Sequence, residues 1–439
     1  MTERPRVRLQ SLGCRLNEAE LEAWAEGFRR LGLRLAGEGE PADLVVVNTC
    51  AVTREAARKS RQMLRRNRRL DSEARLVVSG CLATLEPDAL GKSASPDLIV
   101  ANRDKDRLVE IAAATLGLPV LPARDADAPA RPLFARGRQR AFVKVQDGCR
   151  HRCTFCVTTL ARGEERSRPI AEVVEQVSRL AASGIREVVL TGVHLGGYGS
   201  DLDPEPPRDL GDLIRTLLAD TAVPRIRLGS LEPWGLPDGF WDLFADPRLM
   251  PHLHLPMQSG SDTVLRRMGR RTKAADFARL AQAGRAAVPG LNLTTDIIVG
   301  FPGETESDWQ ETLAFVEAMG FGQVHAFPYS PRPGTRAAEL PGQVDAATRR
   351  RRAGELAEIA GRLRRGVLEA QVGARVPVLR EETPGSGNPR DLFGYTPNYL
   401  PIRIEPDPAA PPVGEILQTR ILGPTPDGAM LLGKHISPA

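Results

Sequence analysis

Three apolar segments within the first hundred residues each run directly into a cysteine. They read "VRLQSLGC", "DLVVVNTC" and "ARLVVSGC" and end at Cys14, Cys50 and Cys81. Helical patterns alternate with these segments, and "DLIV" (97–100) adds a fourth strand-like run, which together predict βαβ units and a parallel sheet. The carboxyl ends of parallel strands meet at one edge of a sheet, where functional sites assemble, so the three thiols could meet there. The alternative is that they are three unrelated core residues, since cysteine is often buried.

The other three cysteines of the chain lie within ten residues, "DGCRHRCTFC" (147–156). Cys149, Cys153 and Cys156 have the spacing C-x3-C-x2-C. The N-terminus has no signal-peptide pattern, and no run approaches the roughly 18 apolar residues of a membrane span, so we expect a cytoplasmic protein. Thiols stay reduced in that compartment, which favours metal binding or catalysis over disulfides for both sets.

Three thiolates in one short loop favour an iron–sulfur cluster over zinc. A zinc ion held only by protein takes four ligands, and His151 lies between two of the cysteines, where its coordination would strain the loop. Iron–sulfur cubanes are usually held by four cysteines. With three, one iron stays open to a substrate or to a cofactor that must react.

The rest of the chain indicates a second α/β region and a small β domain. Residues 117–138 are rich in Pro, Ala and charge without periodicity, which indicates a linker. Six strand-like segments separated by helical patterns predict a partial TIM-like barrel whose site lies on the loops after the strands. A charged helix is expected over 345–370, followed by short strands typical of a compact β-barrel. We therefore expect an α/β protein with an N-terminal parallel-sheet domain (4–116), a central barrel domain (139–369) and a C-terminal β-barrel (371–436).

Basic residues cluster in three runs, although the net charge is only +5. The densest run is "TREAARKSRQMLRRNRRL" (53–70), and the others are Arg349–Arg352 and the group Arg362, Arg364 and Arg365. A solvated helix face explains any one of them. Three together favour a polyanionic partner, most simply a nucleic acid.

The spacing of the second cysteine set is identified as the motif of the radical S-adenosylmethionine superfamily. The resemblance implies a catalytic 4Fe–4S cluster on Cys149, Cys153 and Cys156, whose open iron binds the amino and carboxylate groups of S-adenosylmethionine. Cleavage of that cofactor by the reduced cluster gives a 5′-deoxyadenosyl radical. "LTGVHLGG" (190–197), "LPMQSGSD" (255–262) and "DIIVGFPGETE" (296–306) resemble the superfamily's cofactor loops. The cofactor-binding residues so implied are Phe155, Gly192, Gln258, Gly300 and Glu304.

Over residues 6 to 435 the chain resembles the radical S-adenosylmethionine methylthiotransferases. Their first domain holds a second 4Fe–4S cluster by three cysteines, which implies that role for Cys14, Cys50 and Cys81. "ARGEERSRP" (161–169) and "FPYSPRPGTRAAEL" (327–340) are similar to internal signatures, and "GYTPNYLPIRI" (394–404) resembles the RNA-binding TRAM barrel. Two segments depart from the pattern. "VTTLARG" follows Cys156 where Ile-Ile-Pro-Tyr is usual before Ala-Arg-Gly, and "RMGRRTKAADF" (267–277) lacks an aromatic after its Arg pair. Both segments lie near the catalytic loops, and neither departure touches a cluster ligand.

The family resemblance implies a transferase that acts on one of three substrates. These are N6-threonylcarbamoyladenosine at position 37 of tRNA, isopentenyladenosine in tRNA, and an aspartate of a ribosomal protein. "LGCRLNEAE" (12–20) and "GYTPNY" favour the first. The implied partners are the tRNA anticodon loop, S-adenosylmethionine and an electron donor such as flavodoxin or ferredoxin, with no membrane. The alternative from a different class is an iron–sulfur RNA-binding sensor, which would not need the S-adenosylmethionine loops.

Overall fold

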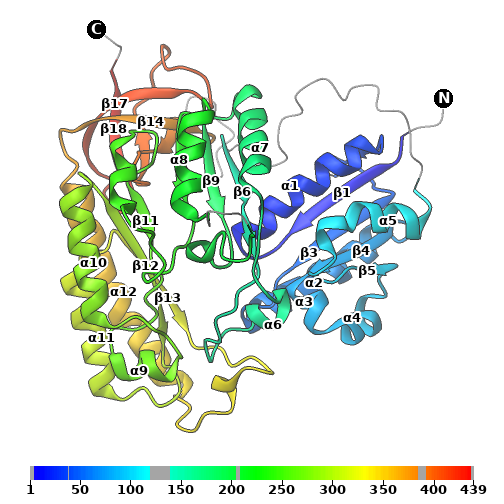
Figure 1. Ribbon diagram of the computed structural model, residues 1–439, viewed down its shortest axis with the longest axis horizontal. Coiled ribbons are helices and arrows are strands. Elements are labelled where there is room, and N and C mark those ends of the chain that lie inside the picture. Colours follow the sequence, from blue (N-terminus) through cyan, green and yellow to red (C-terminus); the bar gives the residue numbers. More distant parts are fainter. Residues whose placement is uncertain (1–3, 38, 119–138, 204–207, 384–391, 437–439) are drawn as a thin grey trace. The chain divides into compact units, whose positions relative to one another are not determined.

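The computed structural model describes residues 4–37, 39–118, 139–203, 208–383 and 392–436 (Figure 1). The chain divides into two compact units. The first, which we call the cysteine unit, comprises Met1–Phe134, Asp147–Glu165 and Ser330–Ala338, and it contains all six cysteines. The second, the barrel unit, comprises Ala135–Gln146, Arg166–Tyr329 and Glu339–Ala439. The expected linker at 117–138 lies outside the described residues, apart from Gly117 and Leu118.

The cysteine unit is built on a parallel sheet with the strand order β2-β1-β3-β4-β5. The strands are β1 (Arg6–Ser11), β2 (Arg34–Leu35), β3 (Leu44–Thr49), β4 (Arg75–Gly80) and β5 (Leu98–Ile99). The helices are α1 (Arg15–Arg30), α2 (Arg54–Leu70), α3 (Cys81–Leu85), α4 (Pro87–Ala94), α5 (Leu108–Leu116), α6 (Thr158–Arg162) and the 3₁₀ turns η1 (Lys105–Arg107) and η5 (Arg336–Ala338).

Helices cover both faces of this sheet, and the central strand is therefore buried along its whole length. Alternate residues of β3 point to opposite faces. Val46 packs in one cluster with Leu21 and Phe28 of α1, while Val45 packs in another with Leu64 of α2. Each fully buried side chain of this size stabilises the fold by about 1.5–3 kcal/mol. The parallel sheet predicted from the alternation of strands and helices is confirmed.

The barrel unit contains six parallel strands in two sheets of three, β10-β9-β6 and β11-β12-β13. Parallel bridges Ile226↔Leu249 and Ser230↔His254 connect the region of β10 to the region of β11. The strands are β6 (Arg140–Lys144), β9 (Glu187–Thr191), β10 (Arg225–Leu228), β11 (His252–His254), β12 (Asn292–Val299) and β13 (Gln323–Pro328). The helices are α7 (Ile170–Ala182), α8 (Leu210–Asp220), α9 (Asp262–Arg267), α10 (Ala274–Ala287), α11 (Glu306–Met319), α12 (Ala346–Glu369) and the 3₁₀ turns η3 (Leu195–Gly197) and η4 (Phe240–Ala245).

The strands follow chain order around an arc, and helices pack on its outer side, as in a partial barrel (Figure 1). The expected TIM-like arrangement is thus confirmed. Two short strands, β7 (Gln146–Asp147) and β8 (Arg166–Ser167), flank in sequence the segment that carries the second cysteine set.

The C-terminal strands form a small closed barrel in the order β14-β15-β16-β18-β17, also as expected. They are β14 (Arg375–Glu381), β15 (Leu392–Tyr395), β16 (Pro401–Ile404), β17 (Ile416–Pro424) and β18 (Leu431–His435). This barrel belongs to the barrel unit and is joined to the larger one by a buried ion pair of 2.7 Å between Arg140 and Glu381. The Arg140 guanidinium also lies 4.3 Å above the ring of Tyr395.

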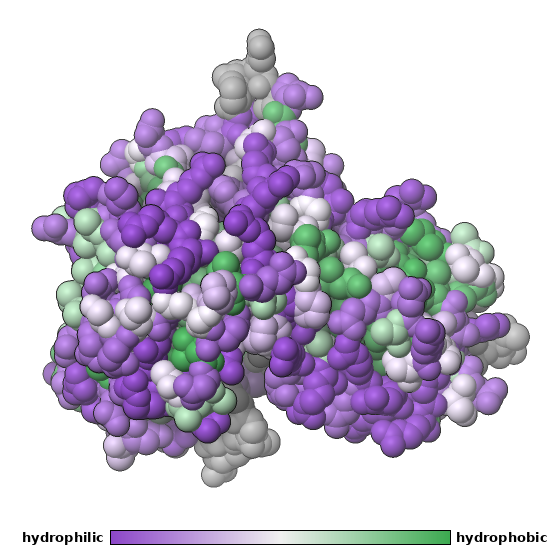
Figure 2. Space-filling model, turned by 90° about the horizontal axis from the view of Figure 1, so that it is seen from below, coloured by the Kyte–Doolittle hydropathy of each residue, from purple (hydrophilic) through white to green (hydrophobic). Residues whose placement is uncertain are grey.

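Hydrophilic residues cover most of the face seen in Figure 2, with smaller hydrophobic patches between them. Among the described residues, no helix combines the length and the apolar composition that crossing a membrane requires.

Candidate active site

Cys14, Cys50 and Cys81 lie at one edge of the parallel sheet, just beyond the carboxyl ends of β1, β3 and β4. Cys14 caps the start of α1, Cys50 follows β3 directly, and Cys81 begins α3. Cys50 and Cys81 are buried and Cys14 is exposed. Burial raises the pKa of the Cys50 thiol to about 11, and Cys81 and Cys14 add to the increase through their charges. The structure therefore brings the three thiols within electrostatic reach of one another.

Two glycines that precede these cysteines allow the close approach. Gly13 and Gly80 have φ angles of +107° and +97°, which residues with a side chain rarely adopt. A Cβ atom at Gly13 would lie 2.7 Å from Cys50 Sγ, and one at Gly80 would lie 2.3 Å from the Thr49 carbonyl oxygen. The turns that carry the thiols thus pack directly on one another without intervening side chains.

A buried network of charged residues surrounds the first cysteine set. Lys105 Nζ lies 2.5 Å from the carboxylate of Glu20, and Arg162 Nη1 lies 2.9 Å from Glu20 and 2.9 Å from Asp147. All four side chains are at most 3% exposed. Arg162 Nη2 also donates a hydrogen bond of 2.8 Å to the side chain of Asn17. Buried charges are tolerated when they are paired and hydrogen-bonded in this way.

The two cations of this network, Arg162 and Lys105, favour the thiolate form of a nearby cysteine. Burial raises the pKa of the Cys81 thiol, whereas the charges of Arg162 and Lys105 lower it. The Asn102 amide also lies 3.7 Å from Cys81 Sγ. Thiolates, not thiols, bind metals, and nearby cations stabilise them. Three thiols beside two buried cations therefore fit the requirements of a 4Fe–4S cluster held by three cysteines.

Sequence reasoning missed the charged partners Glu20, Lys105, Asp147 and Arg162. Glu20 lies inside "LGCRLNEAE" and Arg162 inside "ARGEERSRP", so two of them belong to segments that resemble the family. Asp147 stands two residues before Cys149. Lys105 lies in a short 3₁₀ turn far from any cysteine in sequence, and no local signal distinguishes it from a surface lysine.

Cys149, Cys153 and Cys156 lie in the loop that leads into α6 and are partly exposed. The Cys149 N–H donates to the Gly163 carbonyl at 3.0 Å, and the Cys156 N–H donates to the Cys153 carbonyl at 3.1 Å. These bonds fold the loop back on itself. The His151 N–H points to Cys149 Sγ at 3.4 Å, a contact that favours the thiolate. Phe155 occupies the turn between the last two cysteines and is half-buried.

The segment Ser330–Ala338 contacts the surroundings of both cysteine sets. Its Ser330 hydroxyl accepts a hydrogen bond of 3.3 Å from the N–H of Arg54, at the start of α2. Its Ala337 N–H donates to the carbonyl of Thr154, within the second set, at 2.9 Å. Burial lowers the pKa of Arg332, and the charges of nearby Glu86 and Cys50 partly offset this decrease. The segment belongs to "FPYSPRPGTRAAEL", so this resemblance marks residues that adjoin both sets.

The expected cofactor loops lie in the barrel unit, each after a parallel strand. The side-chain carbonyl of Gln146 accepts hydrogen bonds of 2.9 Å from the N–H groups of Val193 and His194 and so fixes the turn that begins at Gly192. Gln258 has a φ of +76°, and its N–H donates to the Asp296 carbonyl at 2.8 Å. Both loops are thus held by contacts with neighbouring strands.

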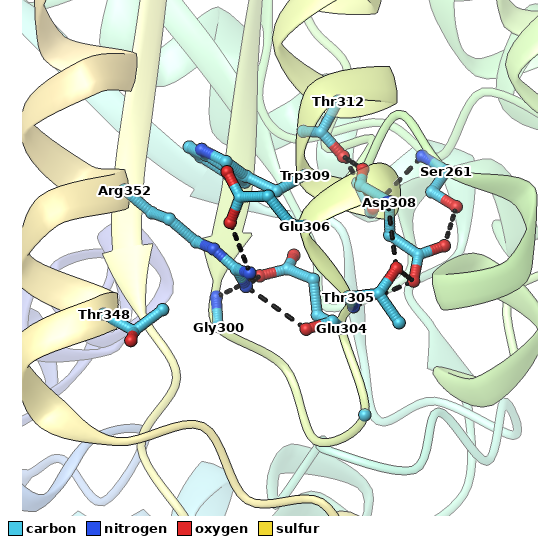
Figure 3. A network of polar contacts seen from close by, with 12 residues as sticks. Ser261, Gly300, Glu304, Thr305, Glu306, Asp308, Trp309, Thr312, Thr348 and Arg352 are labelled. Atoms are coloured by element: carbon cyan, nitrogen blue, oxygen red, sulfur yellow. Dashed lines mark hydrogen bonds and ion pairs between the residues drawn. The ribbon is translucent and has the colours of Figure 1, made fainter.

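Glu304 holds the loop that follows β12 (Figure 3). Its carboxylate accepts a hydrogen bond of 2.8 Å from the N–H of Gly300 and lies 2.6 Å from Arg352 of α12. Burial raises the pKa of Glu304 to about 7, although Arg352 lowers it. The side chain is fully buried, so the structure assigns Glu304 first to shaping the loop around Gly300.

Comparisons with known proteins agree with this arrangement. Residues 143–316 match the family model of the radical SAM superfamily, and residues 6–101 match that of an uncharacterized protein family, UPF0004. The chain is 35% identical over 402 residues to threonylcarbamoyladenosine tRNA methylthiotransferase MtaB of Thermotoga maritima, covering 90% of each protein. It is 34% identical over 426 residues to the protein of the same name from Bacillus subtilis, covering 95% of this chain and 93% of that protein.

A relative named for a different substrate is equally similar. The chain is 36% identical over 442 residues to tRNA-2-methylthio-N(6)-dimethylallyladenosine synthase of Anaeromyxobacter dehalogenans, covering 95% of this chain and 91% of that protein. Among solved structures, the radical S-adenosylmethionine methyltransferase TsrM from Kitasatospora setae has a TM-score of 0.55 at 18% identity and covers 76% of this chain and 77% of its own. That likeness shows the fold alone.

Proposed function

The chain belongs to the family of radical S-adenosylmethionine methylthiotransferases, and we propose that it inserts a methylthio group at carbon 2 of N6-threonylcarbamoyladenosine in tRNA. The observation that carries the proposal is a compact unit with two sets of three cysteines, in a chain that is similar over at least nine-tenths of its length to two enzymes named for this activity. Overall identity does not separate this substrate from dimethylallyladenosine. The segments "LGCRLNEAE" and "GYTPNY" favour the threonylcarbamoyl group.

The two sets have separate roles in this proposal. Cys149, Cys153 and Cys156 would hold a cluster that, with S-adenosylmethionine, would supply radical chemistry able to open the carbon 2–hydrogen bond. Cys14, Cys50 and Cys81 would hold the cluster that would supply sulfur, and a second S-adenosylmethionine would supply the methyl group. An electron donor such as flavodoxin or ferredoxin provides the reducing equivalents. Cys14, Cys50 and Cys81 hold the sulfur-supplying cluster, and Lys105 and Arg162 stabilise its thiolates.

RNA binding is proposed for the exposed face of α2 and for the C-terminal β-barrel, which resembles a TRAM domain. Arg65, Arg66 and Arg69 are exposed, and within the described residues no acidic side chain pairs with them. Arg65 and Arg69, together with Arg68, line an open groove beside 93–95. Such unpaired arginines suit phosphate contacts.

The other two basic runs are largely engaged within the protein. In the second run, Arg351 pairs with Glu306, and Arg352 pairs with Glu304. In the third, Arg362 pairs with Glu317. These arginines stabilise contacts between α12 and its neighbours, so they do not add to the case for a nucleic-acid partner.

We expect the anaerobically reconstituted protein to contain about eight irons, because two cubanes hold four each. Replacing Cys149, Cys153 and Cys156 together by alanine should leave about four, measured by iron and sulfide analysis. The complementary triple variant at Cys14, Cys50 and Cys81 is the matched control and should also leave about four. A triple variant that keeps all its iron would contradict the assignment of that set.

Reversing Arg65, Arg66 and Arg69 to glutamate should weaken tRNA binding and flatten its dependence on salt. Each lost phosphate contact reduces the slope of log K against log salt by about 0.7–0.9. The measurement is a salt series of tRNA titrations. A matched control reverses Arg30, Arg103 and Arg107, which are exposed arginines of the same unit with acidic neighbours. Equal losses in the two variants would mean that only net charge matters, and that α2 is not a specific site.

Mass spectrometry of tRNA nucleosides tests the function directly. A strain that lacks the gene should lose 2-methylthio-N6-threonylcarbamoyladenosine and retain its unmethylthiolated precursor, and the wild-type gene should restore the product. The purified reduced protein should form 5′-deoxyadenosine from S-adenosylmethionine. A protein that binds tRNA and both clusters but never forms 5′-deoxyadenosine would instead be an iron–sulfur sensor.

A further inference from the structure

A group of polar side chains in the barrel unit adjoins the expected cofactor loops, but none of its members is among the residues implied to bind the cofactor or an iron–sulfur cluster. It consists of His254 at the end of β11, Asp296 in β12 and His325 in β13, and we call it the inner-face cluster. One nitrogen or oxygen atom of each side chain lies within 4.8 Å of those of the other two. His254 Nε2 lies 3.3 Å from the Asp296 carboxylate, and the two histidine rings meet edge to face at 5.8 Å between centroids.

The cluster lies on the face of the sheet that is turned away from the helices. Successive residues of a strand point to opposite faces. Leu293, Ile297 and Val299 of β12 belong to the core that the outer helices complete, so Thr294 and Asp296 point the other way. Register places His254 beside Thr294 and Asp296 beside His325. The three side chains therefore lie together on the inner side of the partial barrel.

The inner-face cluster is held in place and remains accessible. The Thr294 hydroxyl lies 2.9 Å from His254 Nδ1 and so fixes that ring. The Asp296 side chain is 23% exposed, and His325 is exposed, as is the neighbouring ring of Phe327. Burial of part of its surface lowers the pKa of His325, which makes its ring a neutral hydrogen-bonding group near pH 7. Within the described residues, no hydrogen bond engages the ring nitrogens of His325.

The cluster also lies close to the expected cofactor loop. Asp296 precedes Gly300 by four residues along β12, which corresponds to about 13 Å at the rise of an extended strand. A base whose carbon 2 lies near the cofactor would place its N6 substituent within range of the inner-face cluster.

We propose that His254, Asp296 and His325 form the subsite that binds the N6 substituent of the substrate base, and that they select a substituent with a carboxylate, a hydroxyl and amide N–H groups. This inference rests on the proposed function. The histidine rings supply N–H donors for a carboxylate, and Asp296 supplies an acceptor for hydroxyl and amide hydrogens.

The same subsite disfavours a dimethylallyl substituent. An apolar group would displace water from three polar side chains without replacing the hydrogen bonds, and unpaired polar groups are costly. A site built to hydrogen-bond its ligand rejects an analogue without those groups far more strongly than an apolar pocket rejects a polar one. The inner-face cluster therefore separates two substrates that overall identity does not.

The test compares two anticodon stem-loop RNAs, one with threonylcarbamoyladenosine and one with dimethylallyladenosine. Wild-type protein, His325→Leu and Asp296→Asn are assayed on both by mass spectrometry of the methylthio product. We expect each variant to lose about tenfold to hundredfold in kcat/KM on the threonylcarbamoyl RNA, mainly through KM. In each variant, the ratio of kcat/KM on the threonylcarbamoyl RNA to kcat/KM on the dimethylallyl RNA should fall by a similar factor. Glu317→Gln, which removes an exposed ion pair on the outer helices, is the control and should match the wild type.

The outcomes are distinguishable. Wild-type protein that acts only on the dimethylallyl RNA would refute the proposed function. The subsite alone would be refuted if the wild-type protein acts on the threonylcarbamoyl RNA and each variant either keeps both activities or loses both by the same factor.

Two histidines and a carboxylate are also a ligand set for divalent metals. Zinc bound at one per chain in wild-type protein, and absent from both variants, would likewise overturn the subsite in favour of a metal centre. Asp296→Asn keeps the shape of the side chain, so it provides the test even if His325→Leu fails to fold.

Discussion

Replacing Cys50 by alanine should abolish formation of the methylthio product while 5′-deoxyadenosine is still formed from S-adenosylmethionine. Cys50 is buried beside Cys81 and Cys14 at the sheet edge, and its loss leaves two thiols to hold a cluster that needs three. The second cysteine set forms its own loop, closed by backbone hydrogen bonds between Cys149 and Gly163 and between Cys156 and Cys153. Radical formation should therefore persist without sulfur insertion.

Cys153→Ala is the matched comparison and should form neither product. Both variants are assayed together for 5′-deoxyadenosine by chromatography and for methylthio-adenosine by mass spectrometry of digested tRNA. The division of roles would be wrong if Cys50→Ala, shown by iron analysis to lack its first cluster, still thiolated tRNA at the wild-type rate.

Replacing Arg162 by methionine should destabilise the cysteine unit by about 3–5 kcal/mol, because removing one partner of a buried ion pair leaves uncompensated charge. Arg162 is 1% exposed and pairs with both Glu20 and Asp147, so the variant removes a cation from two buried carboxylates that Lys105 also contacts. It should also hold iron poorly on the first set, since Arg162 lowers the pKa of the Cys81 thiol.

The measurements are the free energy of unfolding in urea and the iron content after reconstitution. Arg103→Met serves as the control, because Arg103 is 83% exposed and pairs with Asp104 at the surface. Surface pairs of this kind contribute little. If Arg162→Met were as stable as this control, the buried network would have no structural role.

The sequence was most informative where structure is local. A strand that runs into a cysteine is visible within eight residues, and parallel topology then fixes the edge at which Cys14, Cys50 and Cys81 meet. The spacing of the second set is likewise contained in one short loop. Both features depend on neighbours in sequence, and so the cysteine sets and the parallel sheets could be predicted.

The charged residues were harder to interpret, because their role depends on distant partners. Arg162 pairs with Glu20, which lies 142 residues away, and nothing near either residue indicates burial. The run from Arg349 to Arg352 is one of three that together favour a polyanionic partner, yet Arg351 and Arg352 pair with acidic residues of the fold. Figure 3 shows Arg352 turned toward Glu304 and Glu306, whose carboxylates neutralise it. Sequence alone does not reveal which arginines meet acidic residues within the fold.

The cysteine unit consists of three separate stretches of the chain, and this arrangement has a consequence for its biosynthesis. Its sheet is complete by Ile99, but Asp147 and Arg162 belong to the second stretch, and Ser330–Ala338 is the third. A ribosome must therefore translate as far as Ala338 before every residue of this unit exists. A nascent chain stalled before Ala338 exposes thiols whose final neighbours have not been made. Iron that is delivered after release of the chain would bind to the complete site, whereas iron that is delivered earlier would encounter thiols without all of their final neighbours.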